Sequence, residues 1–146
     1  MSIVKFIVSF LTCILSVSAC KTSKEVSSNI KFEGSFKISM LNTNDVSGKG
    51  LTFNIDRSTN KVSGNSGCNS YNGNYELSET NHTISFSRIF TTKMYCVEQE
   101  KNDIEREFLK TLSKEFRIIF KKQGVELEAI SDRSLKISLI KSLQVN

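Results

Sequence analysis

The chain has 146 residues, of which 38% are hydrophobic and 24% are charged, with one histidine and neither tryptophan nor proline. This composition is typical of one globular domain and excludes a polytopic membrane protein, because the apolar residues are too few and too scattered. One histidine argues against a histidine-built metal site or a relay of two imidazoles. The net charge of +5 is mild and spread along the chain, so we expect no nucleic-acid partner.

The first segment of the chain has the pattern of an export signal. Lys5 precedes an apolar run from Phe6 to Val17. As a helix this run rises about 18 Å, which is short of the roughly 30 Å hydrocarbon core of a bilayer. It therefore predicts a signal peptide over residues 1–19.

The sequence VSAC at residues 17–20 resembles a bacterial lipobox, which predicts a lipid-modified Cys20. The alternative is an ordinary secretory signal cut near Ala19. Two or three acyl chains on one residue anchor a protein stably, so the membrane is the first expected partner. The polar residues 20–31 form the expected flexible tether. The residue after the lipid-modified cysteine is Lys21 and not Asp, which resembles the signal that directs enterobacterial lipoproteins to the outer membrane. We therefore expect a bacterial envelope protein anchored in the outer membrane.

Four cysteines reduce to two that are available to the folded domain. Cys13 leaves with the signal peptide and Cys20 carries lipid, so Cys68 and Cys96 remain. Export to an oxidising compartment makes a disulfide between them the default prediction. Free buried thiols, or a reactive or metal-binding pair, stay open as alternatives. Two sulfurs with no nearby histidine make a poor zinc site, so we expect no metal.

Alternating apolar and polar residues dominate the chain from residue 34 onward. This period of two indicates strands with one buried and one solvated face, as in antiparallel sheets. The inward sets are Phe36, Ile38 and Met40; Leu51, Phe53 and Ile55; Tyr75 and Leu77; Ile84 and Phe86; Phe116, Ile118 and Phe120; Val125, Leu127 and Ala129; and Leu135, Ile137 and Leu139.

One segment has helical periodicity. Between Asn102 and Lys114, apolar residues recur at the spacing of a single helix face. Asn102 with Glu105 three residues later resembles a capping box, which places the helix start at Asn102. The predicted order is about five strands, one helix and three strands. The fold class is therefore mainly β, a small antiparallel barrel of about eight strands plugged by one helix.

Four pieces of the chain form a recognisable set, VSGNSGCNSYNGNY at 62–75, FEGSF at 32–36, TKMYC at 92–96 and EREFLKTL at 105–112. Together they resemble the META/HslJ-like domain family, with Phe36 where the family usually has Trp. Their order and spacing extend the predicted domain over residues 32–142. The resemblance implies a lipocalin-like, partly open barrel with one helix. It also implies an envelope protein, often a lipoprotein and sometimes stress-induced, with no established enzymatic activity.

Structural roles for the central motif follow from its residue types. Gly64, Gly67 and Gly73 are expected to permit positive φ or a bulge where the sheet bends. Asn69 is expected to satisfy its own backbone at that bend. Cys68 would then reach Cys96 and tie the bend to the segment before the helix.

An enzyme is the weakest functional interpretation. Ser66 lies between glycines, but its only potential base is His82 in a polar turn, and the string is not G-x-S-x-G. We therefore expect no catalytic residues and no cofactor. The basic residues Lys110, Lys114, Arg117, Lys121 and Lys122 form either a solvated face or a contact for anionic head groups.

Two functions are carried forward. The first is a non-enzymatic, lipid-anchored envelope domain that acts through protein or envelope contacts, in a stress-related setting. The second is a carrier that holds a small apolar ligand in the barrel mouth. Large inward phenylalanines favour a filled core, so a small-molecule ligand is not expected.

Overall fold

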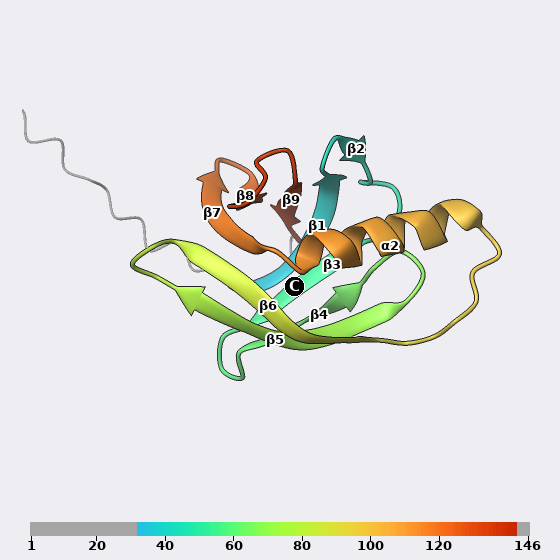
Figure 1. The fold of residues 1–146 in the computed structure, drawn as a ribbon, viewed down its shortest axis with the longest axis horizontal. Helices are drawn as coiled ribbons and strands as arrows, with labels where there is room; N and C mark the ends of the chain where they lie inside the picture. The colour runs from blue at the N-terminus through green and yellow to red at the C-terminus, as the bar shows by residue number, and fades with distance from the viewer. Residues whose placement is uncertain (1–31, 143–146) are drawn as a thin grey trace, which may run out of the picture.

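The computed structural model describes residues 32–142, in which six strands, one helix and three strands follow one another (Figure 1). The sequence predicts about five strands, one helix and three strands, and the two-residue strand Asn44–Asp45 is the additional one. The predicted signal peptide and tether, and with them Cys20, lie outside the described residues. The elements are β1 (Gly34–Leu41), β2 (Asn44–Asp45), β3 (Thr52–Asp56), β4 (Lys61–Asn65), β5 (Ser70–Ser78), β6 (Thr83–Thr91), α2 (Gln99–Leu112), β7 (Glu115–Lys121), β8 (Gly124–Ala129) and β9 (Lys136–Lys141).

The strands form one antiparallel barrel, which confirms the predicted fold class. Neighbouring strands in the sheet follow chain order from β3 to β9, and β1 pairs with both β3 and β9. This second pairing closes the ring of eight strands, so the hydrogen-bonded ladder is continuous rather than partly open. The remaining strand, β2, adds two residues beside β1. Only three residue pairs join β6 to β7, all at the start of β6. The rest of β6 extends beyond β7 and ends at Thr91, before the segment that leads into α2.

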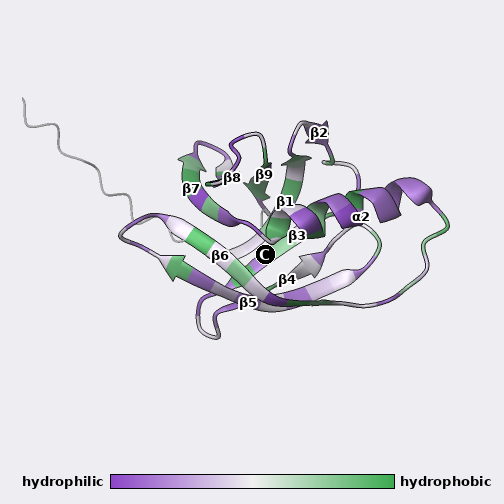
Figure 2. Cartoon of the chain, viewed as in Figure 1, coloured by the Kyte–Doolittle hydropathy of each residue, from purple (hydrophilic) through white to green (hydrophobic). Residues whose placement is uncertain are grey.

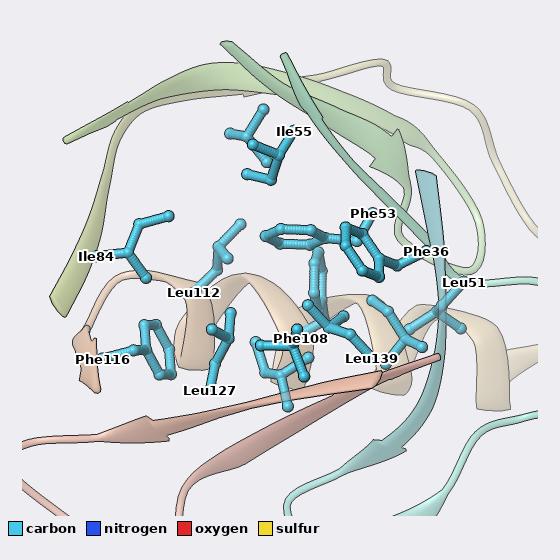
Figure 3. Packing of buried hydrophobic residues seen from close by; sticks show 14 of the residues in the cluster. Phe36, Leu51, Phe53, Ile55, Ile84, Phe108, Leu112, Phe116, Leu127 and Leu139 are labelled. Atoms are coloured by element: carbon cyan, nitrogen blue, oxygen red, sulfur yellow. The ribbon is translucent and has the colours of Figure 1, made fainter. Parts of the chain in front are cut away.

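The barrel interior is filled by large side chains, and α2 supplies part of the filling. Figure 3 shows Phe108 and Leu112 of the helix pointing into the same cluster as Phe53 and Leu127, and all four are fully buried. Much of α2 is coloured hydrophilic in Figure 2, and its buried residues are Phe108, Thr111 and Leu112. Burial of an apolar helix face against a sheet is what holds a short helix in place.

The predicted inward faces are correct for most strands and shift within β1. Phe36 and Ile38 are buried as expected, but Leu41 is buried in place of Met40. The cause is an irregularity in the pairing with β9 between Ile38 and Met40. An extra residue in one strand moves all later side chains to the opposite face.

The helix begins earlier than the sequence predicts. It starts at Gln99 with Glu98 in the capping position, so the capping box at Asn102 is wrong. Asn102 lies inside the first turns, where its amide donates to the Cys96 carbonyl at 3.0 Å. Among the described residues, no helix has the length and apolarity needed to cross a membrane.

Truncating a core phenylalanine should cost far more stability than truncating an exposed one. Phe53→Ala removes a ring that is 0% exposed, whereas Phe90→Ala removes one that is 66% exposed. We expect a loss of about 3–5 kcal/mol in the free energy of unfolding for the first variant, and a change within about 0.5 kcal/mol for the second. Urea denaturation of both purified proteins measures the difference. Equal losses would contradict the filled core.

Candidate functional site

The central motif folds as β4, a tight loop over residues 66–69, and β5. The loop closes on itself through the Ser66 amide, which donates to the Asn69 carbonyl at 2.8 Å. Gly67 has a φ of +111°, a conformation that side chains rarely adopt, and its amide donates to Asn65 Oδ1 at 2.8 Å. The loop therefore has one defined shape, which presents Cys68 and Asn69 to the chain segment before α2.

Gly64 and Gly73 serve close approach rather than positive φ. A Cβ on Gly64 would lie 2.1 Å from the Thr52 carbonyl oxygen. The hydroxyl of Tyr71 donates to the same oxygen at 3.0 Å, and burial raises the pKa of this phenol well above its usual value. A Cβ on Gly73 would lie 2.4 Å from the side chain of Ile89. Any side chain at either glycine would push neighbouring strands apart.

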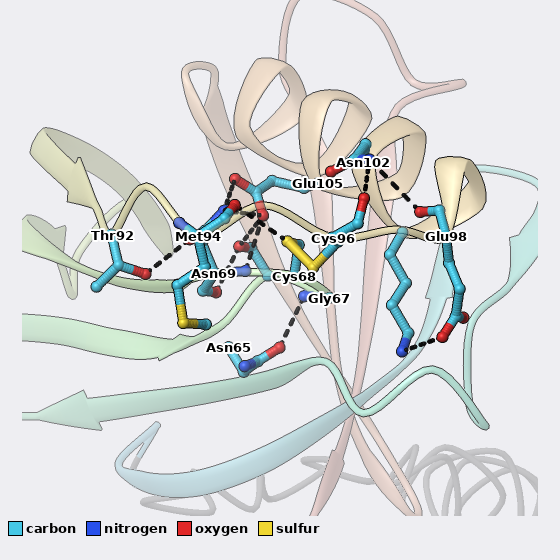
Figure 4. Close-up of a disulfide and its surroundings, with 12 residues drawn as sticks. Asn65, Gly67, Cys68, Asn69, Thr92, Met94, Cys96, Glu98, Asn102 and Glu105 are labelled. Atoms are coloured by element: carbon cyan, nitrogen blue, oxygen red, sulfur yellow. Dashed lines mark hydrogen bonds and ion pairs between the residues drawn. A yellow bond between two sulfur atoms is a disulfide. The ribbon is translucent and has the colours of Figure 1, made fainter.

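A disulfide joins Cys68 to Cys96, with a Cα–Cα distance of 6.0 Å (Figure 4). It connects the β4–β5 loop to the segment that leads from β6 into α2. The free-thiol and metal alternatives for this pair therefore do not apply. In the chain-entropy model a closed loop of this size stabilises the fold by roughly 3–4 kcal/mol.

Asn69 is the hydrogen-bonding centre of this region. Its side-chain oxygen accepts from the Met94 amide at 2.7 Å and from the Thr92 hydroxyl at 2.8 Å. Its side-chain amide and its backbone N–H both donate to the Glu105 carboxylate, at 3.1 and 2.9 Å. The expectation that Asn69 satisfies its own backbone is therefore wrong, because its partners come from two distant segments.

Glu105 brings the helix to the loop. Its carboxylate lies against the β4–β5 loop and also accepts from the Ser66 hydroxyl at 3.1 Å. The sequence pattern assigned this residue to a capping box because its spacing from Asn102 fits that motif. Its actual partner, Asn69, lies 36 residues away in sequence and so leaves no local pattern. The EREFLKTL stretch was nevertheless the signal that could have pointed to it.

The segment that this network holds carries exposed apolar side chains. Met94, Tyr95 and Val97 are 59%, 89% and 88% exposed, and Phe90 at the end of β6 is also exposed. Hydrophobic colouring is visible on the connection that enters α2 (Figure 2). We call residues Phe90–Val97 the apolar segment. Its backbone is fixed at Met94 and Cys96, while the side chains of its four large apolar residues are exposed.

The other sequence-derived candidates do not assemble into a catalytic site. Ser66 is fully buried and bonds the Asn69 carbonyl and Glu105, whereas His82 lies in the β5–β6 turn. A surface groove of about 700 Å³ between β2 and α2 carries acidic side chains. Glu100 there already pairs with Lys49, and Glu107 with the Asn42 amide. Within residues 32–142, no three potential ligands gather into a metal cluster.

The match to a family model identifies the class of protein. The META domain model matches residues 28–141. The chain therefore belongs to the META domain family. No curated protein matches the sequence.

Solved structures share the fold at low sequence identity. A protein from Burkholderia xenovorans, determined by NMR, is 23% identical with a TM-score of 0.59, covering 77% of this chain and 83% of that one. A second NMR structure is 15% identical with a TM-score of 0.57, covering 78% and 93%. A crystal structure of a DUF4847 family protein from Bacteroides vulgatus is 10% identical with a TM-score of 0.53, covering 77% and 94%. At these identities the likeness shows the fold alone.

Removing the Glu105 charge should destabilise the domain through the loop. In Glu105→Gln an amide group meets donors from Asn69 and Ser66, so at least one part-buried donor loses its partner. We expect a loss of about 1–3 kcal/mol in the free energy of unfolding. Glu100→Gln on the same helix is the matched control, because Glu100 is 62% exposed and its ion pair with Lys49 is a surface one. Denaturant titration of both variants tests this, and equal effects would contradict the anchoring role of Glu105.

Proposed function

We propose that the chain is a non-enzymatic, lipid-anchored domain of the bacterial envelope that acts through its outer surface. The observation that carries this proposal is the filled barrel interior. Phe53 of β3 contacts Phe86 of β6, with ring centroids 5.6 Å apart, and Phe86 contacts Phe116 of β7 at 6.0 Å. These rings cross the barrel from wall to wall. A domain whose interior is closed in this way has its surface left for binding.

The anchor supports an envelope location within this proposal. The lipobox-like VSAC sequence supplies Cys20, and residues 21–31 separate it from Phe32, which is the first residue that the structure describes and is buried. A disulfide in the folded domain fits an oxidising compartment outside the cytoplasm. The proposal also includes two more specific points, that Lys21 directs the protein to the outer membrane and that the protein acts in a stress-related setting.

An apolar-ligand carrier is the alternative that the barrel fold admits. Its ligand would need the space inside the barrel. Aromatic rings and the helix residues Phe108 and Leu112 already fill this space, which disfavours the carrier. Membership of the META domain family favours a non-catalytic domain over an enzyme.

Membrane association should depend on Cys20. Cys20→Ala removes the only thiol at the lipobox position, whereas Cys13→Ala changes a cysteine inside the apolar run of the signal. Expressed as full chains in a bacterial host, the wild type and Cys13→Ala should fractionate with membranes and Cys20→Ala should not. Membrane-bound Cys20→Ala protein, or wild type in the soluble fraction, would contradict the anchor.

Native mass spectrometry of the protein solubilised from its own membranes tests the closed interior. We expect the acylated chain, alone or with a protein partner. A released small molecule, bound stoichiometrically, would overturn the surface role and support the carrier. Phe53→Ala is the informative comparison, because a cavity in the core should admit a small apolar compound that the wild type excludes.

A further inference from the structure

The fold places Phe90 in solvent by means of a bulge. In β6, Ile84 is buried and Phe86 packs against the core, so the inward positions are even-numbered. Two residues of β6, Arg88 and Ile89, then stand opposite Gly73 of β5, and Arg88 has a positive φ of 51°. This bulge reverses the faces, so that Ile89 packs inward and Phe90 is 66% exposed.

The rest of the apolar segment is held in one conformation rather than left loose. The Met94 amide is bonded to Asn69, the Thr92 amide donates to the Ser70 carbonyl at 3.0 Å, and Cys96 is bound covalently. Figure 4 shows the segment running from Thr92 past Met94 and Cys96 to Glu98 along the loop that carries Asn69. A backbone that is already ordered loses little conformational freedom on binding, which favours association.

The charges along the segment are ordered. Exposed Arg88 lies just before the segment and exposed Lys93 lies within it, and neither forms an ion pair within residues 32–142. Glu98 and Glu100 follow directly after it, with side chains 65% and 62% exposed. Their partners Lys101 and Lys49 form surface ion pairs, which hold them weakly.

This order is self-complementary when two copies run antiparallel. Lys93 of one copy then meets Glu98 of the other, and a two-fold axis repeats the contact. Met94, Tyr95 and Val97 of both copies meet between these charged ends, and Phe90 lies beyond Lys93 at the edge of the contact. We propose that the apolar segment is the interface of a homodimer, with Lys93 paired to Glu98 of the second copy. The proposal rests on the surface role proposed above and names the partner.

A membrane surface fits the segment less well. Glu98, Glu100 and Asp103 lie beside it at the start of α2, and anionic head groups would repel them.

The size of the segment determines the expected strength of the dimer. An aromatic side chain buries about 150–250 Å², and each copy offers two aromatic and two aliphatic side chains, which gives an interface at the low end of the specific range. We therefore expect a weak dimer, populated at about 10–100 μM chain.

Charge exchange tests the pairing. Lys93→Glu and Glu98→Lys each place like charges together twice in the dimer, so each should weaken self-association roughly tenfold or more. In an equimolar mixture, the glutamate at position 93 of one variant meets the lysine at position 98 of the other, and the two unaltered groups meet at the second contact. The mixture should therefore dimerise about as well as the wild type.

The measurement is sedimentation velocity of the full chain purified from membranes in mild detergent, over the stated concentration range. Lys61→Glu and Glu76→Lys on exposed positions of β4 and β5 are the matched controls and should dimerise like the wild type. Thermal unfolding by circular dichroism checks that each variant folds. Tyr95→Ala should weaken the dimer without changing the charges.

The homodimer would be overturned by a wild type that stays monomeric, by charge variants that associate like the wild type, or by a mixture that does not recover. Capture of a different protein through the apolar segment would also overturn it while leaving the surface role intact. A stoichiometric small molecule released in native mass spectrometry would instead contradict the surface role itself. The two failures are therefore distinguishable.

Discussion

The contact between Asn69 and Glu105 determines how the helix, the motif loop and the apolar segment sit together. One asparagine side chain accepts from the Met94 amide and donates to the helix carboxylate. Its position in turn depends on the tight loop that Gly67 permits. Because buried polar groups must be paired, a change to any member of this set leaves the others unsatisfied. The disulfide at the neighbouring Cys68 adds a covalent constraint on the same two segments.

The glycines of the motif contribute to the same region in different ways. Gly64 allows β4 to approach the Thr52 carbonyl, and Gly73 allows β5 to face the bulge in β6. That bulge directs Phe90 outward while Ile89 packs inward. The sequence predicted that the glycines of this motif permit a bend in the sheet. In the structure Gly64 and Gly73 instead allow close contacts between strands, and these contacts position an exposed apolar surface.

The interior and the surface of this META domain differ in character. Aromatic rings and helix side chains fill the barrel, and the proposed function assigns binding to the surface. The exposed apolar side chains are concentrated between β6 and α2, where hydrogen bonds and a disulfide hold the backbone. Rigid presentation of apolar groups is the usual basis of recognition, because the cost of ordering is met during folding rather than during binding.

Local pattern was sufficient for the strands, the single helix and the barrel class, because side-chain alternation and helical spacing depend on near neighbours in sequence. Cysteine counting was likewise sufficient for the Cys68–Cys96 pair. The helix start, the partners of Asn69, the shift to Leu41 and the exposure of Phe90 did not follow from pattern. Each depends on a bulge or on a contact between distant segments, such as Asn69 with Glu105, and such contacts are selected by packing of the whole barrel.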